Sequence, residues 1–162
     1  MCIRDRFDAA AALLGLCPYQ SYEGEAAMQL ESLVHDPRCL PDGYRITGQI
    51  LDFRPLLASL LEPGLQPREG AELFHGTLIA GLVEWIARTA TTLGRTDIVL
   101  GGGCMINRTL AAGLAAGLRL RGLAAWLPRA VPANDGGLSL GQAAIARAHL
   151  MKSGASSQPS RG

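Results

Sequence analysis

The chain has 162 residues, of which 48% are hydrophobic and 18% charged, and its formal net charge is +1. This length suits one domain or a portion of a larger one, and the apolar share is enough to build a core. The near-zero charge, without a basic stripe, argues against a protein that binds nucleic acid. No apolar run is long enough to span a membrane and no secretory signal pattern opens the chain, so we expect a cytoplasmic protein.

The cysteines and histidines show no metal-binding spacing. The four cysteines form no C-x-x-C pair, and the three histidines form no H-x-x-x-H pair. Reduced thiols are expected, and Cys104, beside a glycine run, is expected to be a packed small residue rather than a nucleophile. His75, inside a predicted helix, is expected to be a core or surface residue rather than a general base.

The first part of the chain is predicted to be mainly helical. In chain order we expect a helix over residues 7–16, a helix over 25–35, a short strand or hairpin over 44–51, a short helix over 54–61 and a long helix over 68–93. Apolar residues at helical spacing support the helices, and β-branched alternation supports the strand or hairpin. Prolines and glycines separate these elements.

The second part alternates between strand and helix. A buried-strand pattern covers residues 97–100, a helix is expected over about 107–120, a short strand over 124–127, and a turn and helix over 131–150. Strands that alternate with helices favour a parallel sheet with crossover connections. The sequence therefore predicts an α/β fold.

The stretch IVLGGGCMINR, residues 98–108, is the strongest local signal. Its glycines let the backbone approach a ligand closely, and the helix start that follows offers free N–H groups to an anion. The Asn107 amide can both donate and accept hydrogen bonds. The pattern is neither a P-loop nor a dinucleotide fingerprint. Two interpretations stay open: a nucleotide site, or a tight strand–helix turn capped by Asn107.

Carboxylates at helix starts form a second group of candidates. Asp135, in VPANDGG, is expected to cap the following helix, and it is also suited to bind a metal, although one carboxylate cannot make a site alone. Asp8 is expected in the first turn of a helix, where it complements the helix dipole. In SYEGEAA, Gly24 can serve a turn and Glu25 a helix start.

Taken together and in this order, FDAAAALLGL, SYEGEAAMQLE, LFHGTL, VLGGGCMINRTL and VPANDGGLSLGQAAIA resemble the C-terminal region of the HypF carbamoyltransferase family. The resemblance runs from about residue 7 to residue 150. It implies that residues 7–152 are the C-terminal portion of a TsaD-like carbamoyltransferase domain, part of a two-lobed α/β domain of the actin-like ATPase (ribonuclease H-like) class. Residues 1–6 are then expected to be a non-native start, and residues 153–162, rich in Ser, Gly and Pro, a disordered tail.

The resemblance also implies an activity. In the family, carbamoyl phosphate and ATP give a carbamoyl-adenylate. The carbamoyl group then passes to the C-terminal cysteine of a HypE-type maturation protein, in cyanide-ligand synthesis for nickel–iron hydrogenases. Two other functions stay open: part of a TsaD-like enzyme of tRNA threonylcarbamoyladenosine synthesis, and a non-catalytic module that docks a maturation partner.

Residue roles follow from the same resemblance. The positions that match the family's nucleotide site are Asp8, Gly24, Glu25, Gly101, Gly102, Gly103 and Asn107. Gly101 stands where the family usually has a serine. Asp135 matches the carboxylate that helps two histidines hold a divalent metal ion. That histidine pair is absent from these 162 residues, so the chain resembles a fragment and negligible turnover is expected from it alone.

Overall fold

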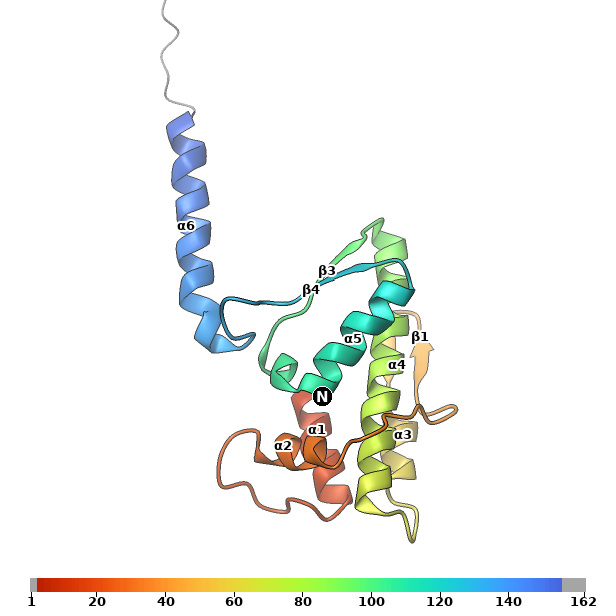
Figure 1. Cartoon of the computed structure of the whole chain (residues 1–162). Coiled ribbons are helices and arrows are strands. Elements are labelled where there is room, and N and C mark those ends of the chain that lie inside the picture. Colours follow the sequence, from red (N-terminus) through yellow and green to blue (C-terminus); the bar gives the residue numbers. More distant parts are fainter. Residues whose placement is uncertain (1–2, 156–162) are drawn as a thin grey trace, which may run out of the picture.

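The protein, described by a computed structural model over residues 3–155, has a helical body, two short sheets and one helix that stands apart (Figure 1). The elements in order are α1 (Ile3–Leu13), α2 (Glu25–Ser32), β1 (Arg45–Thr47), β2 (Ile50–Asp52), α3 (Arg54–Ser59), α4 (Pro67–Leu93), β3 (Asp97–Val99), η1 (Gly103–Ile106), α5 (Arg108–Leu120), β4 (Ala124–Trp126), η2 (Asp135–Gly137) and α6 (Leu138–Ala155).

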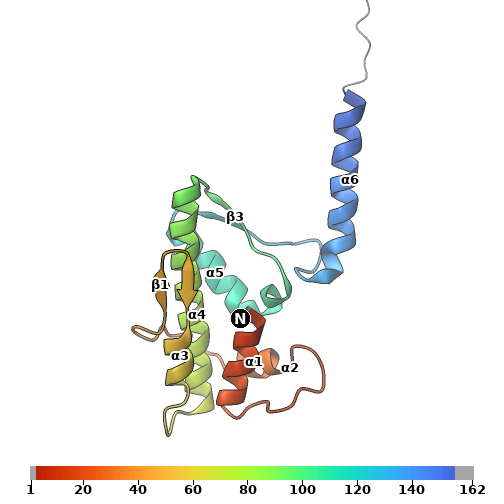
Figure 2. The ribbon, with the colours of Figure 1, turned by 180° about the vertical axis from the view of Figure 1, so that it is seen from behind.

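The long helix α4 runs through the helical body, and the other elements of the body lie around it (Figures 1 and 2). It starts at Pro67, whose lack of an N–H costs no hydrogen bond because the first N–H groups of a helix have no partner within it. It ends at Gly94, which adopts the left-handed conformation with φ of 61°. Phe74 and Leu78 are completely buried at its centre. The core therefore forms where α1, α3 and α5 pack onto the middle of α4.

Two short sheets flank this core. β1 and β2 form an antiparallel hairpin, and β3 and β4 pair in parallel on either side of the α5 crossover. In the second sheet Ile98 and Ala125 pack against the core, whereas Val99 and Trp126, which lie opposite each other, are 78% and 59% exposed. Of the short strand or hairpin expected over 44–51, the structure has the hairpin, and the predicted strand–helix–strand unit is confirmed.

The two ends of the chain differ from the expected structure. Helix α1 begins at Ile3, so residues 3–6 are helical and Asp8 lies in the second turn rather than the first. Residues 3–6 were not predicted as helix because this segment is mostly polar and has no apolar spacing. At the other end, residues 153–155 belong to α6 and not to a disordered tail. The expected tail beyond them lies outside the described residues, and the non-native origin of residues 1–6 stays a prediction.

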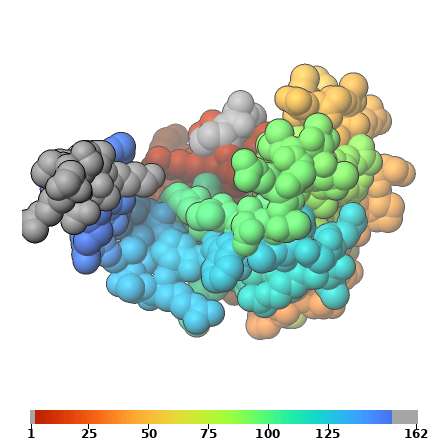
Figure 3. Space-filling model, turned by 90° about the horizontal axis from the view of Figure 1, so that it is seen from above, coloured from red at the N-terminus to blue at the C-terminus, as the bar shows by residue number. Residues whose placement is uncertain are grey.

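Helix α6 stands away from the body (Figures 1 and 2), and the segment between β4 and α6, light blue in Figure 3, leads out to it. Every residue from Leu138 to Met151 is exposed. Its large apolar side chains are 56–74% exposed: Leu138, Leu140, Ile145, Leu150 and Met151. A helix that is apolar on most sides is normally buried, so we expect the apolar surface of α6 to pack against another protein surface. Among residues 3–155, no helix has both the length and the hydropathy to cross a membrane.

We expect the 162-residue chain to self-associate through α6. The double change Leu140→Lys and Ile145→Lys should shift the chain toward monomer, because two charges replace apolar surface. It should alter the free energy of unfolding of the body by less than about 0.5 kcal/mol, since both side chains are exposed. Sedimentation velocity at several concentrations measures the shift, with Arg147→Lys as the control. A parent chain that is already monodisperse and monomeric would contradict the prediction.

Candidate functional site

An exposed glycine turn follows β3. Gly102 has φ of 96° and ψ of 166°, a conformation that essentially only glycine adopts at low cost. A Cβ atom added at Gly101, Gly102 or Gly103 would have open space within 4 Å. The turn therefore presents backbone that no neighbouring side chain covers, as a ligand that approaches the main chain requires.

The glycine turn lies beside the turn that carries Asp135. The Gly102 N–H donates to the Ala133 carbonyl at 2.8 Å, which joins the two segments. Within the second turn the Asn134 Oδ1 accepts a hydrogen bond from the Gly136 N–H at 3.1 Å. The expectation that Asp135 is the capping residue is wrong, because Asn134 supplies the capping oxygen and the Asp135 side chain is exposed.

A metal site cannot be assembled from the described residues alone. Within residues 3–155, no three His, Cys, Asp or Glu side chains come together in a group that could hold a metal ion. Asp135 offers one exposed carboxylate, and a bound ion requires several donors. Its role as a metal ligand stays a prediction that depends on donors beyond these residues.

The start of α5 is already capped by protein side chains. Asn107, 7% exposed, uses its Oδ1 to accept from the Leu110 N–H at 2.8 Å. Glu31 of α2 accepts from the Thr109 N–H at 3.0 Å. The predicted Asn107 cap is confirmed. The expectation that this helix start offers free N–H groups to an anion fails at these two positions, because both amides are already bonded.

His75 lies completely buried behind Asn107. Its Nδ1 is 2.9 Å from the Ala71 carbonyl oxygen, and its Nε2 is 3.1 Å from Asn107 Nδ2. The rings of Phe7 and Phe74 meet it edge-on, with centroids at 5.4 and 5.6 Å. Burial lowers the pKa of His75, against smaller opposing effects from its bond to Ala71 and from the charge of Glu31. His75 is therefore a buried core residue, one of the two placements expected for it.

The remaining predicted residues gather around the loop between α1 and α2. Gln20 donates to Asp8 Oδ1 at 3.1 Å, and its own amide oxygen accepts from the backbone N–H at the start of α2. Gly24, with φ of 87°, is the residue before that helix, and Glu25 accepts from the Ser21 N–H at 2.6 Å. Because α1 also contacts η1, this loop and the glycine turn adjoin the same helix.

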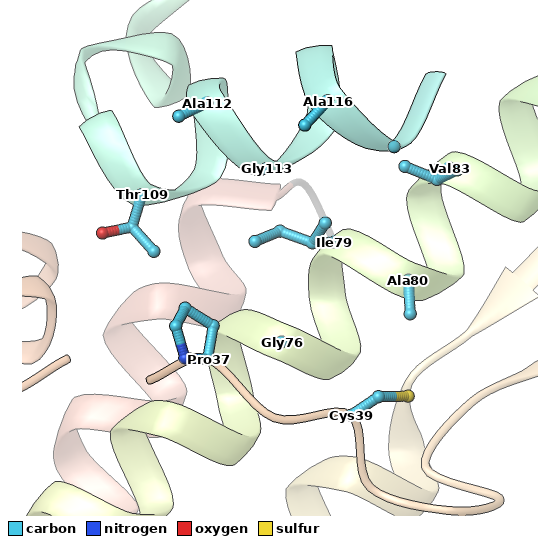
Figure 4. A pocket seen from close by; sticks show the side chains of 11 residues that line it. Pro37, Cys39, Gly76, Ile79, Ala80, Val83, Thr109, Ala112, Gly113 and Ala116 are labelled. Carbon is cyan, nitrogen blue, oxygen red and sulfur yellow. The ribbon is translucent and has the colours of Figure 1, made fainter. Parts of the chain in front are cut away.

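Two surface hollows are distinct from these residues. One, of about 600 Å³, lies between α4, α5 and the segment at Pro37 and Cys39 (Figure 4). Small and apolar side chains line it without any charged group, so it suits apolar contact rather than a phosphate. The other, of about 550 Å³, contains Glu84, Arg88 and Arg121. None of the predicted site residues lines either hollow.

Three side chains shape the candidate site although no role in it was predicted for them: Gln20, Glu31 and His75. A polar ring inside the apolar stretch LFHGTL was the available signal for His75, because a buried polar group needs partners. No local signal joins Glu31 to Thr109, since the two lie 78 residues apart.

Capping and ligand roles can be separated by two alanine substitutions. Asn107→Ala should lower the free energy of unfolding by about 1–2 kcal/mol, because it removes a buried cap and leaves His75 unpaired. Asp135→Ala should change it by less than about 0.5 kcal/mol, because that side chain is exposed. Urea denaturation measures both. Equal losses for the two variants would contradict this assignment of the caps.

The β3–α5–β4 unit and its glycine turn lie within the segment that a family of subdomains matches. The family described as "Carbamoyltransferase, Kae1-like Domain, second subdomain" matches residues 6–142. Carbamoyltransferase HypF of Rhizobium leguminosarum bv. viciae is 55% identical over 157 residues, which is 96% of this chain and 21% of that protein. A HypF homologue of Cupriavidus necator is 43% identical over 155 residues, 86% of this chain and 39% of its own length.

Solved structures agree with these relatives. A full-length HypF in its phosphate- and nucleotide-bound form matches with a TM-score of 0.80 at 31% identity, over 91% of this chain and 20% of that one. HypF of T. kodakarensis matches with a TM-score of 0.80 at 25% identity, over 93% and 20%. The chain belongs to the HypF carbamoyltransferase family. The predicted fold class, an α/β C-terminal portion of the family's domain, is confirmed, and the chain spans about a fifth of these solved structures.

Proposed function

We propose that this chain is the nucleotide-facing C-terminal portion of a HypF-type carbamoyltransferase. Such an enzyme would use carbamoyl phosphate and ATP, through a carbamoyl-adenylate, to carbamoylate the C-terminal cysteine of a HypE-type protein during hydrogenase maturation. The observation that supports this most directly is the open glycine turn, which is hydrogen-bonded to the turn that carries Asp135. The family match covers both turns. A similar full-length HypF was solved in a phosphate- and nucleotide-bound form, so a nucleotide is a ligand of that protein.

The described residues suggest how a nucleotide would be held. The uncovered backbone of Gly101–Gly103 can approach the phosphate without steric hindrance. The carboxylates of Asp8 and Glu25 accept hydrogen bonds from the protein here, and ribose hydroxyls can replace those donors. Asn107 differs, because its amide already joins Leu110 to His75. We therefore assign Asn107 to the shape of the turn and not to direct contact.

The transfer step defines what the site has to stabilise. The thiolate sulfur of the partner's cysteine bonds to the carbonyl carbon of the carbamoyl-adenylate, the bond from that carbon to the phosphate oxygen breaks, and AMP leaves. Negative charge develops on the carbonyl oxygen as the sulfur attacks, so aimed N–H groups lower the barrier. The partner provides the nucleophile, which agrees with Cys104 being a half-buried packing residue. Asp135 is proposed as one metal ligand, and the other donors would come from outside residues 3–155.

A chimera tests this function. The matching 157-residue segment of the Rhizobium HypF is replaced by this chain, and carbamoyl-phosphate-dependent release of pyrophosphate from ATP is measured. We expect the chimera to be active and to transfer labelled carbamoyl groups to a HypE-type protein, whereas the 162-residue chain alone should show negligible turnover. A folded chimera that does not bind ATP would overturn the proposal. Transfer to tRNA adenosine would instead support a TsaD-like function, and partner binding without nucleotide a docking module.

A further inference from the structure

His75 and Asn107 form a buried relay between two backbone groups whose hydrogen-bonding roles are fixed. The Ala71 carbonyl, which can only accept, lies 2.9 Å from His75 Nδ1, and the Leu110 N–H, which can only donate, lies 2.8 Å from Asn107 Oδ1. Between them, His75 Nε2 and Asn107 Nδ2 are 3.1 Å apart. One assignment satisfies all three contacts: a neutral ring with its proton on Nδ1, and an amide that donates to Nε2.

The relay continues to the glycine turn through the backbone. The Asn107 N–H donates to the Cys104 carbonyl at 3.2 Å, and the Met105 N–H donates to the Gly102 carbonyl at 3.0 Å. The short helix η1 thus links the capping residue of α5 to the glycine with the unusual backbone conformation. A displacement of Asn107 would therefore act on the segment that follows Gly102.

We propose that His75 is a positioning residue for the nucleotide site, which accepts a hydrogen bond from Asn107 and so holds the Gly101–Gly103 turn in the shape that receives the nucleotide. This inference rests on the proposed nucleotide site. The ring is completely buried, with Phe7 and Phe74 packed edge-on against it, so it does not touch the ligand itself.

Protonation of the ring would break the relay in either orientation of the amide. An Nε2–H would face the Asn107 NH₂ group, and turning the amide to accept it would place that NH₂ against the Leu110 N–H. Among the groups packed around the ring, Phe7 of α1 and Phe74 of α4 are not ionisable, and Glu31 of α2 provides the charge that acts on it. The relay therefore holds at neutral pH and fails on acidification.

Asn107→Asp separates the relay from the helix cap. A carboxylate at this position keeps an oxygen for the Leu110 N–H but presents an acceptor, rather than a donor, to His75 Nε2. We expect the ring to become doubly protonated at pH 7, as read by ¹⁵N NMR of the chain. Asn134→Asp is the matched control, because Asn134 also caps a turn through its Oδ1 and is not a neighbour of His75 in the relay.

The effect on nucleotide binding is measured as the KM for ATP of the chimera. In Asn107→Asp the doubly protonated ring donates to the carboxylate and the Leu110 N–H stays bonded, so the KM for ATP should stay close to that of the parent and should not rise on acidification. In the unmodified chimera, the same KM should rise on acidification in step with titration of the His75 ring, a measurement that does not depend on any variant folding.

Three results would overturn the inference. The first is an unmodified chain whose His75 carries its proton on Nε2, which would exclude the relay. The second is protonation of the ring on acidification of the unmodified chimera that leaves the KM for ATP unchanged; the proposed function would then survive without this role for His75. The third is an unmodified chimera that does not bind ATP, which would overturn the proposed function and this inference together.

Discussion

Phe74→Ala is expected to lower the free energy of unfolding by about 3–5 kcal/mol. The Phe74 side chain is completely buried at the middle of α4, and its ring meets that of Phe7 edge-on with centroids 5.1 Å apart. Truncation therefore removes apolar burial, an aromatic contact between α4 and α1, and one of the two rings that pack against His75. Because domains are stable by only about 5–15 kcal/mol, this is a large part of the total.

Urea denaturation followed by circular dichroism measures that loss. Tyr19→Ala is the control, because Tyr19 is 90% exposed and its removal should alter stability by less than about 0.5 kcal/mol. A loss below about 1 kcal/mol at Phe74 would show that α1 and α4 do not share one core.

Gly76→Ala is expected to lower the free energy of unfolding by about 2 kcal/mol. Alanine favours a helix over glycine by about 1 kcal/mol, so intrinsic propensity alone predicts a gain. At this position, however, a Cβ would come within 2.4–2.5 Å of the backbone of Arg38. That backbone cannot move cheaply, because the Arg38 N–H donates to the Glu72 carbonyl and the Leu40 N–H donates to the Thr77 hydroxyl.

Gly113→Ala in α5 is the matched control for Gly76→Ala. There an added Cβ would meet the Ile79 side chain, with Cδ1 at 2.5 Å, and that side chain borders the apolar hollow in Figure 4. The end of a side chain can rotate away where a tethered backbone cannot, so we expect a smaller loss, under about 1 kcal/mol. Equal losses at the two glycines would indicate that the Arg38 segment adjusts as easily as a side chain.

Local sequence patterns were enough to predict most elements of this fold. The α4 helix follows from apolar spacing that begins after Pro67 and stops at Gly94, and both end residues act through their own backbone geometry. The parallel pairing of β3 and β4 follows from a strand–helix–strand order. The glycine turn and the Asn107 cap were likewise predictable, because each depends on residues within a few positions of one another.

Contacts between distant residues could not be predicted in this way. Glu31 reaches the start of α5, and His75 on α4 meets Asn107, because the packing of three helices places them together. The cap assigned to Asp135 was wrong for a smaller reason: two neighbouring residues, Asn134 and Asp135, can both cap, and the turn geometry selects the first. Whether the predicted nucleotide residues touch a nucleotide stays a proposal.

The most direct test is an equilibrium titration of the chimera with ATP, comparing Gly102→Ala with Gly101→Ser. A side chain at Gly102 strains a backbone conformation that costs other residues about 1–3 kcal/mol, whereas a side chain at Gly101 has open space. If the glycine turn receives the nucleotide, Gly102→Ala should weaken ATP binding about tenfold and Gly101→Ser should bind like the parent. Equal ATP affinity in the parent and both folded variants would contradict a nucleotide site at this turn.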